Sequence, residues 1–123
     1  MITFDNFTPA EGSPIYMQII MHIKRGIAAG VIQNEDELPS RRVLSALLGV
    51  NPNTVQKAYR ILEEEALITS HAGAKSYMHL DESKMKEVKA SLLESDMLHI
   101  IHSMQQMGIT KEEAIRFMDQ YWR

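Results

Sequence analysis

The 123-residue sequence contains no cysteine, which excludes disulfide bonds and cysteine-ligated zinc and fits a reducing cytoplasm. No apolar run approaches the ~18 residues that a membrane-spanning helix needs. The first residues also lack the basic and apolar stretches of a signal peptide. Glycine and proline are few, and no repeat or low-complexity tract is present. We therefore expect a cytoplasmic globular protein without a membrane partner, with one compact domain and at most a small appendage.

An excess of positive charge is missing too, because the formal net charge is −3. Residues 1–80 carry seven Lys/Arg against eight Asp/Glu, and residues 81–123 carry six against eight. The segment 38–62, however, contains four basic residues and no acidic one. Phosphate binding needs local positive potential and not a positive total. Any DNA-binding surface is therefore expected in this acid-free segment.

The first helix is predicted by an apolar repeat of four residues. Ser13 is a suitable N-cap, Pro14 suits the first helical position, and Gly30 suits the end of the helix. The repeat consists of Ile15, Ile19, Ile23 and Ile27. A polar turn is expected over residues 33–37.

Two shorter helices, joined by a few residues, are predicted next. Ser40 caps the first of them and Gly49 ends it, and Asn51 caps the second with Pro52 at its first position. We assign the buried side of the first to Val43, Leu44, Leu47 and Leu48. The apolar face of the second consists of Val55, Ala58, Tyr59 and Leu62. This pair is typical of a helix-turn-helix, whose second helix enters the major groove of DNA.

The rest of the chain predicts a hairpin and then two helices. Residues 67–70 and 76–80 read as short strands around a turn that contains Gly73. From residue 81 a broad apolar stripe predicts a long helix, and Thr110 with Glu113 forms a capping box before another. The expected fold is mainly α with a small β-hairpin. A winged helix-turn-helix DNA-binding domain spans 1–80, and a two-helix C-terminal dimerisation tail spans 81–123.

The chemistry of DNA recognition gathers in the helix-turn-helix. Asn53 and Gln56 offer the paired donor and acceptor that read adenine, while Lys57 and Arg60 can reach guanine or phosphate. Arg41 and Arg42 oppose the dipole in the first turn of their helix, which an external phosphate would explain. The backbone N–H groups that start both helices suit phosphates as well. The alternative is an ordinary solvated face with surface arginines.

Several ordered motifs resemble the DNA-binding domain of GntR-family regulators. They are residues 14–19 (PIYMQI), 38–44 (LPSRRVL) and 49–63 (GVNPNTVQKAYRILE). The resemblance continues into the expected wing, covers roughly residues 13–78 and implies a winged helix-turn-helix. It implies DNA contacts at Arg42, at the start of the helix that Asn51 caps (the recognition helix) and at Gly73, the glycine of the wing. The predicted DNA-binding residues, from both lines of argument, are Ser40, Arg41, Arg42, Asn51, Pro52, Asn53, Thr54, Gln56, Lys57, Arg60, His71, Gly73 and Lys75.

The sequence departs from the family pattern at three positions. Glu35 and Ala66 stand where the family usually has glycine, which is expected to alter turn geometry without removing a DNA contact. Pro52 stands where the family commonly has a basic residue, so one base or phosphate contact is absent. A plain exposed hairpin tip remains the alternative to DNA contact at His71 and Lys75.

The short tail resembles that of the YtrA-type members of the family. This resemblance implies dimerisation through the tail and a place beside ABC-transporter genes. We therefore expect a homodimer on a two-fold-symmetric operator of double-stranded DNA, acting as a repressor. The predicted dimerisation residues are Met85, Val88, Leu92, Met97, Ile101, Met104, Ile115, Met118 and Trp122. The alternative is that this stripe completes the core of the single protomer.

Functions other than regulation find less support in the sequence. Asp96, His99 and His102 follow one another at spacings of three, but three such residues arise by chance, and we predict no metal and no cofactor. The chain has no phosphate loop, nucleophile elbow or zinc-hydrolase motif, so we do not expect an enzyme. A winged helix that binds proteins is the alternative, and salt dependence of binding distinguishes it from DNA binding. The sequence identifies no effector.

Overall fold

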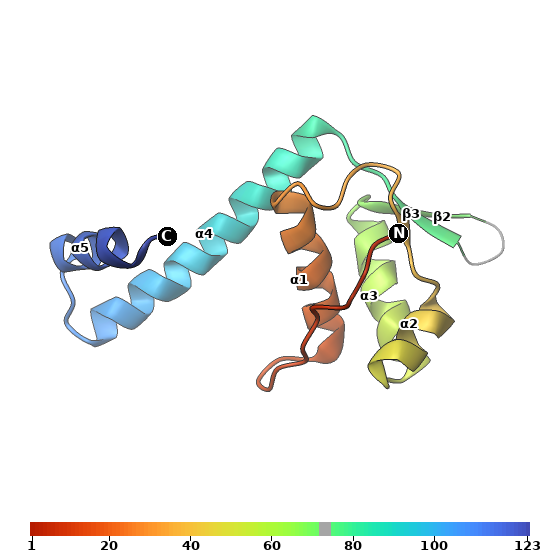
Figure 1. Cartoon of the computed structure of the whole chain (residues 1–123), viewed down its shortest axis with the longest axis horizontal. Coiled ribbons are helices and arrows are strands. Elements are labelled where there is room, and N and C mark those ends of the chain that lie inside the picture. The colour runs from red at the N-terminus through yellow and green to blue at the C-terminus, as the bar shows by residue number, and fades with distance from the viewer. Residues whose placement is uncertain (72–74) are drawn as a thin grey trace. The chain divides into compact units, whose positions relative to one another are not determined.

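The structure is a computed structural model that describes residues 1–71 and 75–123 (Figure 1). The described elements are, in order, α1 (Ile15–Ala28), β1 (Glu37–Leu38), α2 (Arg41–Leu48), α3 (Pro52–Glu64), β2 (Ile68–His71), β3 (Lys75–Met78), α4 (Glu82–Gln106) and α5 (Lys111–Tyr121). The chain forms two compact units, Met1–Lys89 and Ala90–Arg123. Among the described helices, none has the length and apolar composition needed to cross a bilayer.

The core of the first unit lies where α1 packs on α3. The predicted isoleucine stripe is confirmed at Ile19, Ile23 and Ile27, which are fully buried or nearly so, while Ile15 is half-buried. The facing side of α3 is equally closed to solvent, through Val55, Ala58, Tyr59 and Leu62. Burying one such large side chain stabilises the fold by about 1.5–3 kcal/mol. This packing fixes which face of α3 remains available for another molecule.

The helix ends follow from local capping chemistry. The Ser40 hydroxyl accepts from the Val43 N–H at 3.1 Å, and the Asn51 side chain accepts from the Asn53 N–H at 2.8 Å, as predicted. The capping box at the start of α5 is also present. The predicted cap at Ser13 is wrong, because α1 begins at Ile15 behind an extended Pro14 that makes no side-chain cap. There the Gln18 amide bonds the preceding segment instead.

Helix α2 buries less than its sequence indicates. Leu44 is fully buried, but Val43 and Leu47 are 58% and 63% exposed. The inner side of α2 is completed by Ser45, whose hydroxyl donates to the Arg42 carbonyl at 2.9 Å. The predicted buried face of three leucines and one valine is therefore wrong at Val43 and Leu47, since an eight-residue helix contacts the core along a narrow strip.

The hairpin is part of a three-stranded antiparallel sheet in the order β1-β3-β2. Glu37 pairs with Tyr77 and Leu38 with Ser76, so the predicted polar turn over 33–37 ends in a strand. The residue before a proline favours extended backbone, and Leu38 precedes Pro39. This edge strand joins the hairpin to the segment before α2 within the first unit.

Among the described residues, two that are not glycine adopt left-handed backbone. They are Glu35, with φ of 70°, and Ala66, with φ of 61°. These are the two positions where glycine is usual in the resembled family. A side chain in this conformation costs roughly 1–2 kcal/mol, which glycine avoids.

Replacing Ala66 by glycine is expected to raise the free energy of unfolding. Relief of the left-handed strain exceeds the added entropy of the unfolded chain, so we expect a gain of about 0.5–1 kcal/mol. Thermal and urea unfolding measure it. The same substitution at Ala46, an exposed position inside right-handed α2, is the control and should lose about 1 kcal/mol. Equal losses at both positions would contradict the strain at Ala66.

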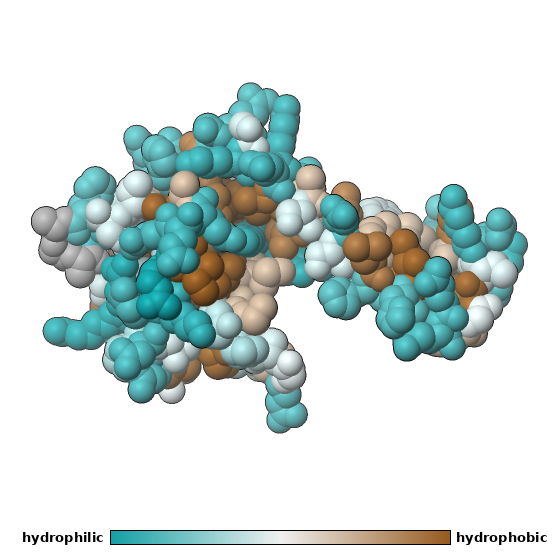
Figure 2. Space-filling view, turned by 180° about the vertical axis from the view of Figure 1, so that it is seen from behind, coloured by the Kyte–Doolittle hydropathy of each residue, from teal (hydrophilic) through white to brown (hydrophobic). Residues whose placement is uncertain are grey.

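The second unit, Ala90–Arg123, is helical and carries much exposed apolar surface. None of the residues of α5 is buried. Figure 2 shows apolar side chains gathered on this unit. The exposed large apolar residues of the unit are Leu93, Leu98, Ile100, Ile101, Met107, Ile115, Phe117, Met118, Tyr121 and Trp122. Contiguous apolar surface on this scale is typical of an interaction site.

Candidate nucleic-acid interface

Helices α2 and α3 form a helix-turn-helix through a short, tightly defined connection. Gly49 takes left-handed backbone with φ of 66°, which ends α2 without steric cost. The Val50 N–H donates to the Ser45 carbonyl at 3.0 Å, and Asn51 caps α3 directly afterwards. The turn therefore sets the direction of α3 by backbone bonds and one side-chain cap.

The outward face of α3 is a polar row. Asn53, Gln56, Lys57 and Arg60 are all exposed, while the opposite face of the helix is buried in the core. The predicted division of α3 into two faces is confirmed. This row combines amide groups, which suit base edges, with cations, which suit guanine or phosphate.

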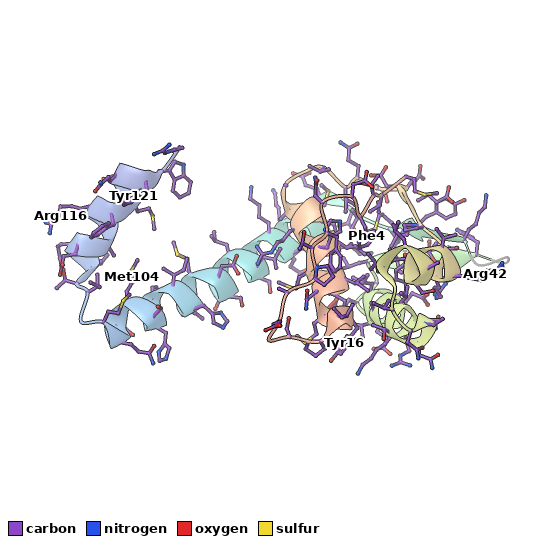
Figure 3. The ribbon with its side chains drawn as sticks, turned by 60° about the horizontal axis from the view of Figure 1, so that its bottom comes forward. Phe4, Tyr16, Arg42, Met104, Arg116 and Tyr121 are labelled. Carbon is purple, nitrogen blue, oxygen red and sulfur yellow. The ribbon has the colours of Figure 1, made fainter. Side chains whose placement is uncertain are left out.

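Lys57 has a defined direction within this row. Its Nζ lies 4.0 Å from the centroid of the Tyr16 ring, on the first turn of α1. A cation over an aromatic face is attracted by about 0.5–1 kcal/mol at an exposed site. Tyr16, labelled in Figure 3, therefore lies beside this row, although it is not among the predicted DNA-binding residues.

The start of α3 satisfies its own backbone. Pro52 has no N–H, the Asn53 N–H donates to the Asn51 side chain, and the Thr54 N–H donates to the Asn51 carbonyl at 2.9 Å. These donors are already used within the chain, and phosphate binding by the start of α3 stays a prediction. At the start of α2 the first N–H group that donates to Ser40 is that of Val43. Phosphate binding by the N–H groups before it stays a prediction.

The two neighbouring arginines of α2 differ in their surroundings. Arg42 is exposed, and Figure 3 shows its side chain at the periphery of the first unit. The Arg41 guanidinium turns to Glu63 on α3, with Nη2 and Oε1 2.9 Å apart. The charge of Arg41 therefore meets a carboxylate of the same chain, and its contact with DNA stays a prediction. Sequence reasoning missed Glu63, because this contact spans 22 positions.

The hairpin carries two further predicted contacts near its tip. His71 and Lys75 face each other as the last described pair of β2 and β3, and both are exposed. The His71 ring lies edge-on to Tyr77, with centroids 5.4 Å apart. Gly73, the predicted wing contact, lies outside the described residues.

Acidic residues cluster at the far end of α3. Glu63 pairs with Arg41, Glu64 lies 3.9 Å from Arg60, and Glu65 bonds Lys24 at 3.0 Å. These three carboxylates follow the acid-free segment 38–62 directly in the sequence. A phosphate near Asn53 or Arg42 would meet no carboxylate from the segment 38–62.

Tyr59 supports the site from inside. Its hydroxyl donates to the Pro39 carbonyl at 2.7 Å. Burial raises the pKa of the Tyr59 phenol above its ordinary value, and the Arg41 guanidinium opposes this rise in part. The phenol therefore stays protonated and keeps its bond to the residue before Ser40.

The structure offers no support for a metal centre in the part of the chain that it describes. No group of three or more His, Asp or Glu residues gathers there to hold a metal. The His99 Nδ1 bonds the Ser95 carbonyl of its own helix at 2.9 Å. His99 and His102 line only an open hollow beside Ser95 and Leu98.

The predicted dimerisation residues fall into three groups by their exposure. Val88 and Leu92 are 9% and 8% exposed, so they pack within the chain itself. Met85, Met97 and Met104 are half-buried. The remaining residues, Ile101, Ile115, Met118 and Trp122, are exposed. Only the half-buried and exposed residues can contribute to an interface without rearrangement.

A helix-turn-helix with a polar outward row, followed by an antiparallel hairpin, defines a winged helix-turn-helix DNA-binding protein. The sequence pattern of the bacterial regulatory proteins of the gntR family matches residues 15–77. The chain belongs to the GntR family, and it is a DNA-binding transcriptional regulator.

Individual relatives agree in sequence and in fold. The HTH-type transcriptional repressor YtrA of Bacillus subtilis (strain 168) is 35% identical over 106 residues, which are 86% of this chain and 77% of that protein. A GntR family transcriptional regulator from Listeria monocytogenes is 31% identical with a TM-score of 0.81, over 91% of this chain and 98% of its own. YtrA from Sulfolobus acidocaldarius, a GntR-family transcription factor, is 29% identical with a TM-score of 0.53, over 97% and 94%. The predicted family, its YtrA-like type and the fold class are confirmed.

Proposed function

We propose that this regulator is a repressor that binds a two-fold-symmetric operator as a homodimer. The observation that carries the proposal is the exposed polar row of α3, held outward by a fully buried opposite face. The name of the Bacillus subtilis relative, a transcriptional repressor, supports the direction of regulation. Transporter genes of the ABC type are the targets that its YtrA-like character favours.

The proposed DNA contacts divide by chemistry. Asn53 and Gln56 read base edges, and Arg42 binds phosphate from the start of α2. Lys57 and Arg60 extend the cationic side of the row. The complete proposed set is Ser40, Arg42, Asn51, Pro52, Asn53, Thr54, Gln56, Lys57, Arg60, His71, Gly73 and Lys75.

The proposed dimer forms through the second unit. Its apolar residues exceed what one small helical unit covers by itself, and a second copy offers the same surface by symmetry. A two-fold operator needs such a partner, because each recognition helix reads one half-site. The proposed interface residues of the second unit are Met97, Ile101, Met104, Ile115, Met118 and Trp122, and Met85, earlier on α4, is proposed to extend them. The functional division at residue 80 belongs to the same proposal, with DNA binding before it and dimerisation after it.

The test is fluorescence anisotropy with the DNA upstream of the protein's own gene, at two salt concentrations, with random DNA as competitor. We expect Arg42→Ala to weaken binding to specific and random DNA alike. We expect Asn53→Ala to cost about 1–3 kcal/mol on the operator alone, since one base contact is lost. Arg116→Ala, an exposed arginine of α5, is the matched control. Equal losses on both DNAs for Asn53→Ala would contradict its role in base reading.

Weak binding that is equal on operator and competitor DNA would contradict the operator proposal. If the winged helix binds a protein instead, its affinity for that protein should depend little on salt concentration, because no phosphate contacts are broken.

A further inference from the structure

The Arg41 side chain is the centre of a polar cluster that joins three elements. Its Nη2 lies 2.9 Å from the Glu63 carboxylate of α3 and 3.3 Å from the Ser70 hydroxyl of β2. Its Nη1 lies 3.5 Å from the Ser76 hydroxyl of β3. The guanidinium also lies over the Tyr59 ring, 5.2 Å from its centroid. One side chain thus links the start of α2 to the recognition helix and to both strands of the hairpin.

The members of this Arg41 cluster also bond one another. The Ser70 hydroxyl donates to Glu63 Oε1 at 2.5 Å and lies 3.1 Å from the Ser76 hydroxyl. Ser76 is 1% exposed, so the cluster reaches into the core. Buried polar groups are costly unless they are paired, so the cluster favours one arrangement of its members.

The cluster lies next to the proposed DNA contacts in three directions. Arg42 follows Arg41 directly in the first turn of α2. Ser70 and Ser76 form the strand pair before the pair of His71 and Lys75. Glu63 stands on the helix that carries the polar row. A change in this cluster therefore alters the relative placement of Arg42, the recognition helix and the hairpin.

The surroundings of Arg41 leave it poorly placed to bind DNA. Its guanidinium charge is met by Glu63, and its side chain is 21% exposed. Its Nε is buried and has no hydrogen-bond partner among the described residues. Breaking these contacts to reach a phosphate would remove the positive charge beside the Glu63 carboxylate and one hydrogen bond from each of the Ser70 and Ser76 hydroxyls.

We propose that Arg41 is a positioning residue, which fixes the hairpin and Arg42 relative to the recognition helix without contacting DNA. This inference rests on the proposed operator binding. A cluster of this kind modulates affinity through geometry, and we expect its loss to weaken operator binding about 3- to 30-fold.

The test compares Arg41→Gln, Glu63→Gln and the double variant by operator titration over a range of salt concentrations. We expect both single variants to weaken binding similarly, and the double variant to be no weaker than either, because all three remove one cluster. The slope of log affinity against log salt should stay unchanged. Arg42→Gln is the matched control, and loss of its phosphate contact should reduce the slope by about 0.9.

The direction in which Glu63→Gln changes operator affinity distinguishes a phosphate contact by Arg41 from a positioning role. It removes a negative charge near DNA, so it should tighten binding if Arg41 is simply a phosphate contact, and weaken binding if Arg41 needs Glu63 for its position. Arg41→Lys adds a second distinction. Lysine keeps the charge that a phosphate needs but lacks the planar fork that spans a carboxylate and two hydroxyls, so we expect it not to restore affinity.

The positioning role is overturned if Arg41→Gln lowers the salt slope while Glu63→Gln tightens binding. It is also overturned if neither variant changes operator affinity. Failure of the operator proposal gives a different result, since wild-type protein and Arg42→Gln would then bind operator and random DNA equally. Circular dichroism spectra of every variant establish that the fold is kept.

Discussion

A glutamate in place of Ile101 is expected to separate the proposed dimer into monomers and to weaken operator binding about 100-fold. Ile101 is 46% exposed on α4, so the chain itself can accept a charge there. Between two copies the same carboxylate would be buried without a partner, which an apolar interface does not tolerate. Each monomer would then hold a single half-site and lose the gain in affinity that a linked second site provides.

Sedimentation equilibrium measures the state of assembly, and anisotropy with a full operator and with a half-site measures the loss. The control is Ser103→Glu, which adds the same charge on α4 about 200° around the helix from Ile101. We expect this variant to remain dimeric. An Ile101→Glu protein that stays dimeric would contradict the assigned face, and a monomeric one with full operator affinity would contradict the need for a dimer.

Replacing Gly26 by alanine is expected to lower the free energy of unfolding by about 1–3 kcal/mol, although alanine is the better helix former. A β-carbon at position 26 would lie 2.5 Å from Cδ1 and 2.8 Å from Cγ1 of Ile32. Ile32 is 5% exposed and cannot turn away freely. The N–H groups of Val31 and Ile32 both donate to the Gly26 carbonyl at 3.0 Å, which holds the chain against the helix.

The cause can be isolated by a double-mutant cycle with Ile32→Ala. Removing the crowded side-chain atoms should make Gly26→Ala neutral or stabilising, so the two substitutions together should cost less than their sum. Urea unfolding of the four proteins gives the coupling free energy. Strict additivity would show that the close approach to Ile32 is not what requires glycine.

The parts of the fold that the sequence predicted correctly depend on near neighbours. The caps at Ser40 and Asn51 each join residues two or three positions apart, and the buried face of α3 follows from its own periodicity. Strand β1 was missed because its two residues form a strand only by pairing with Tyr77 and Ser76. These caps and the buried face of α3 were predicted because they join residues close together in the chain, and β1 was missed because its partners are distant.

The candidate site shows the same limit. Exposure of the polar row was predictable from α3 alone. The role of Arg41 was not, because its partners Glu63, Ser70 and Ser76 lie 22 to 35 positions away. The left-handed backbone at Glu35 and Ala66 could be predicted in part, since a family pattern that prefers glycine marks such positions.

The self-capped start of α3 has a consequence for how this protein can change its target. Asn51 and Pro52 cap the start of the helix without help from DNA. The side chains of Asn53 and Gln56, which are proposed to read bases, are exposed and do not pack in the core. Recognition and folding are thus separate properties of the same helix. Exchanging the outward row for that of another regulator should transfer the preferred operator while leaving the melting temperature nearly unchanged, so new binding sites can arise in evolution without a penalty in stability.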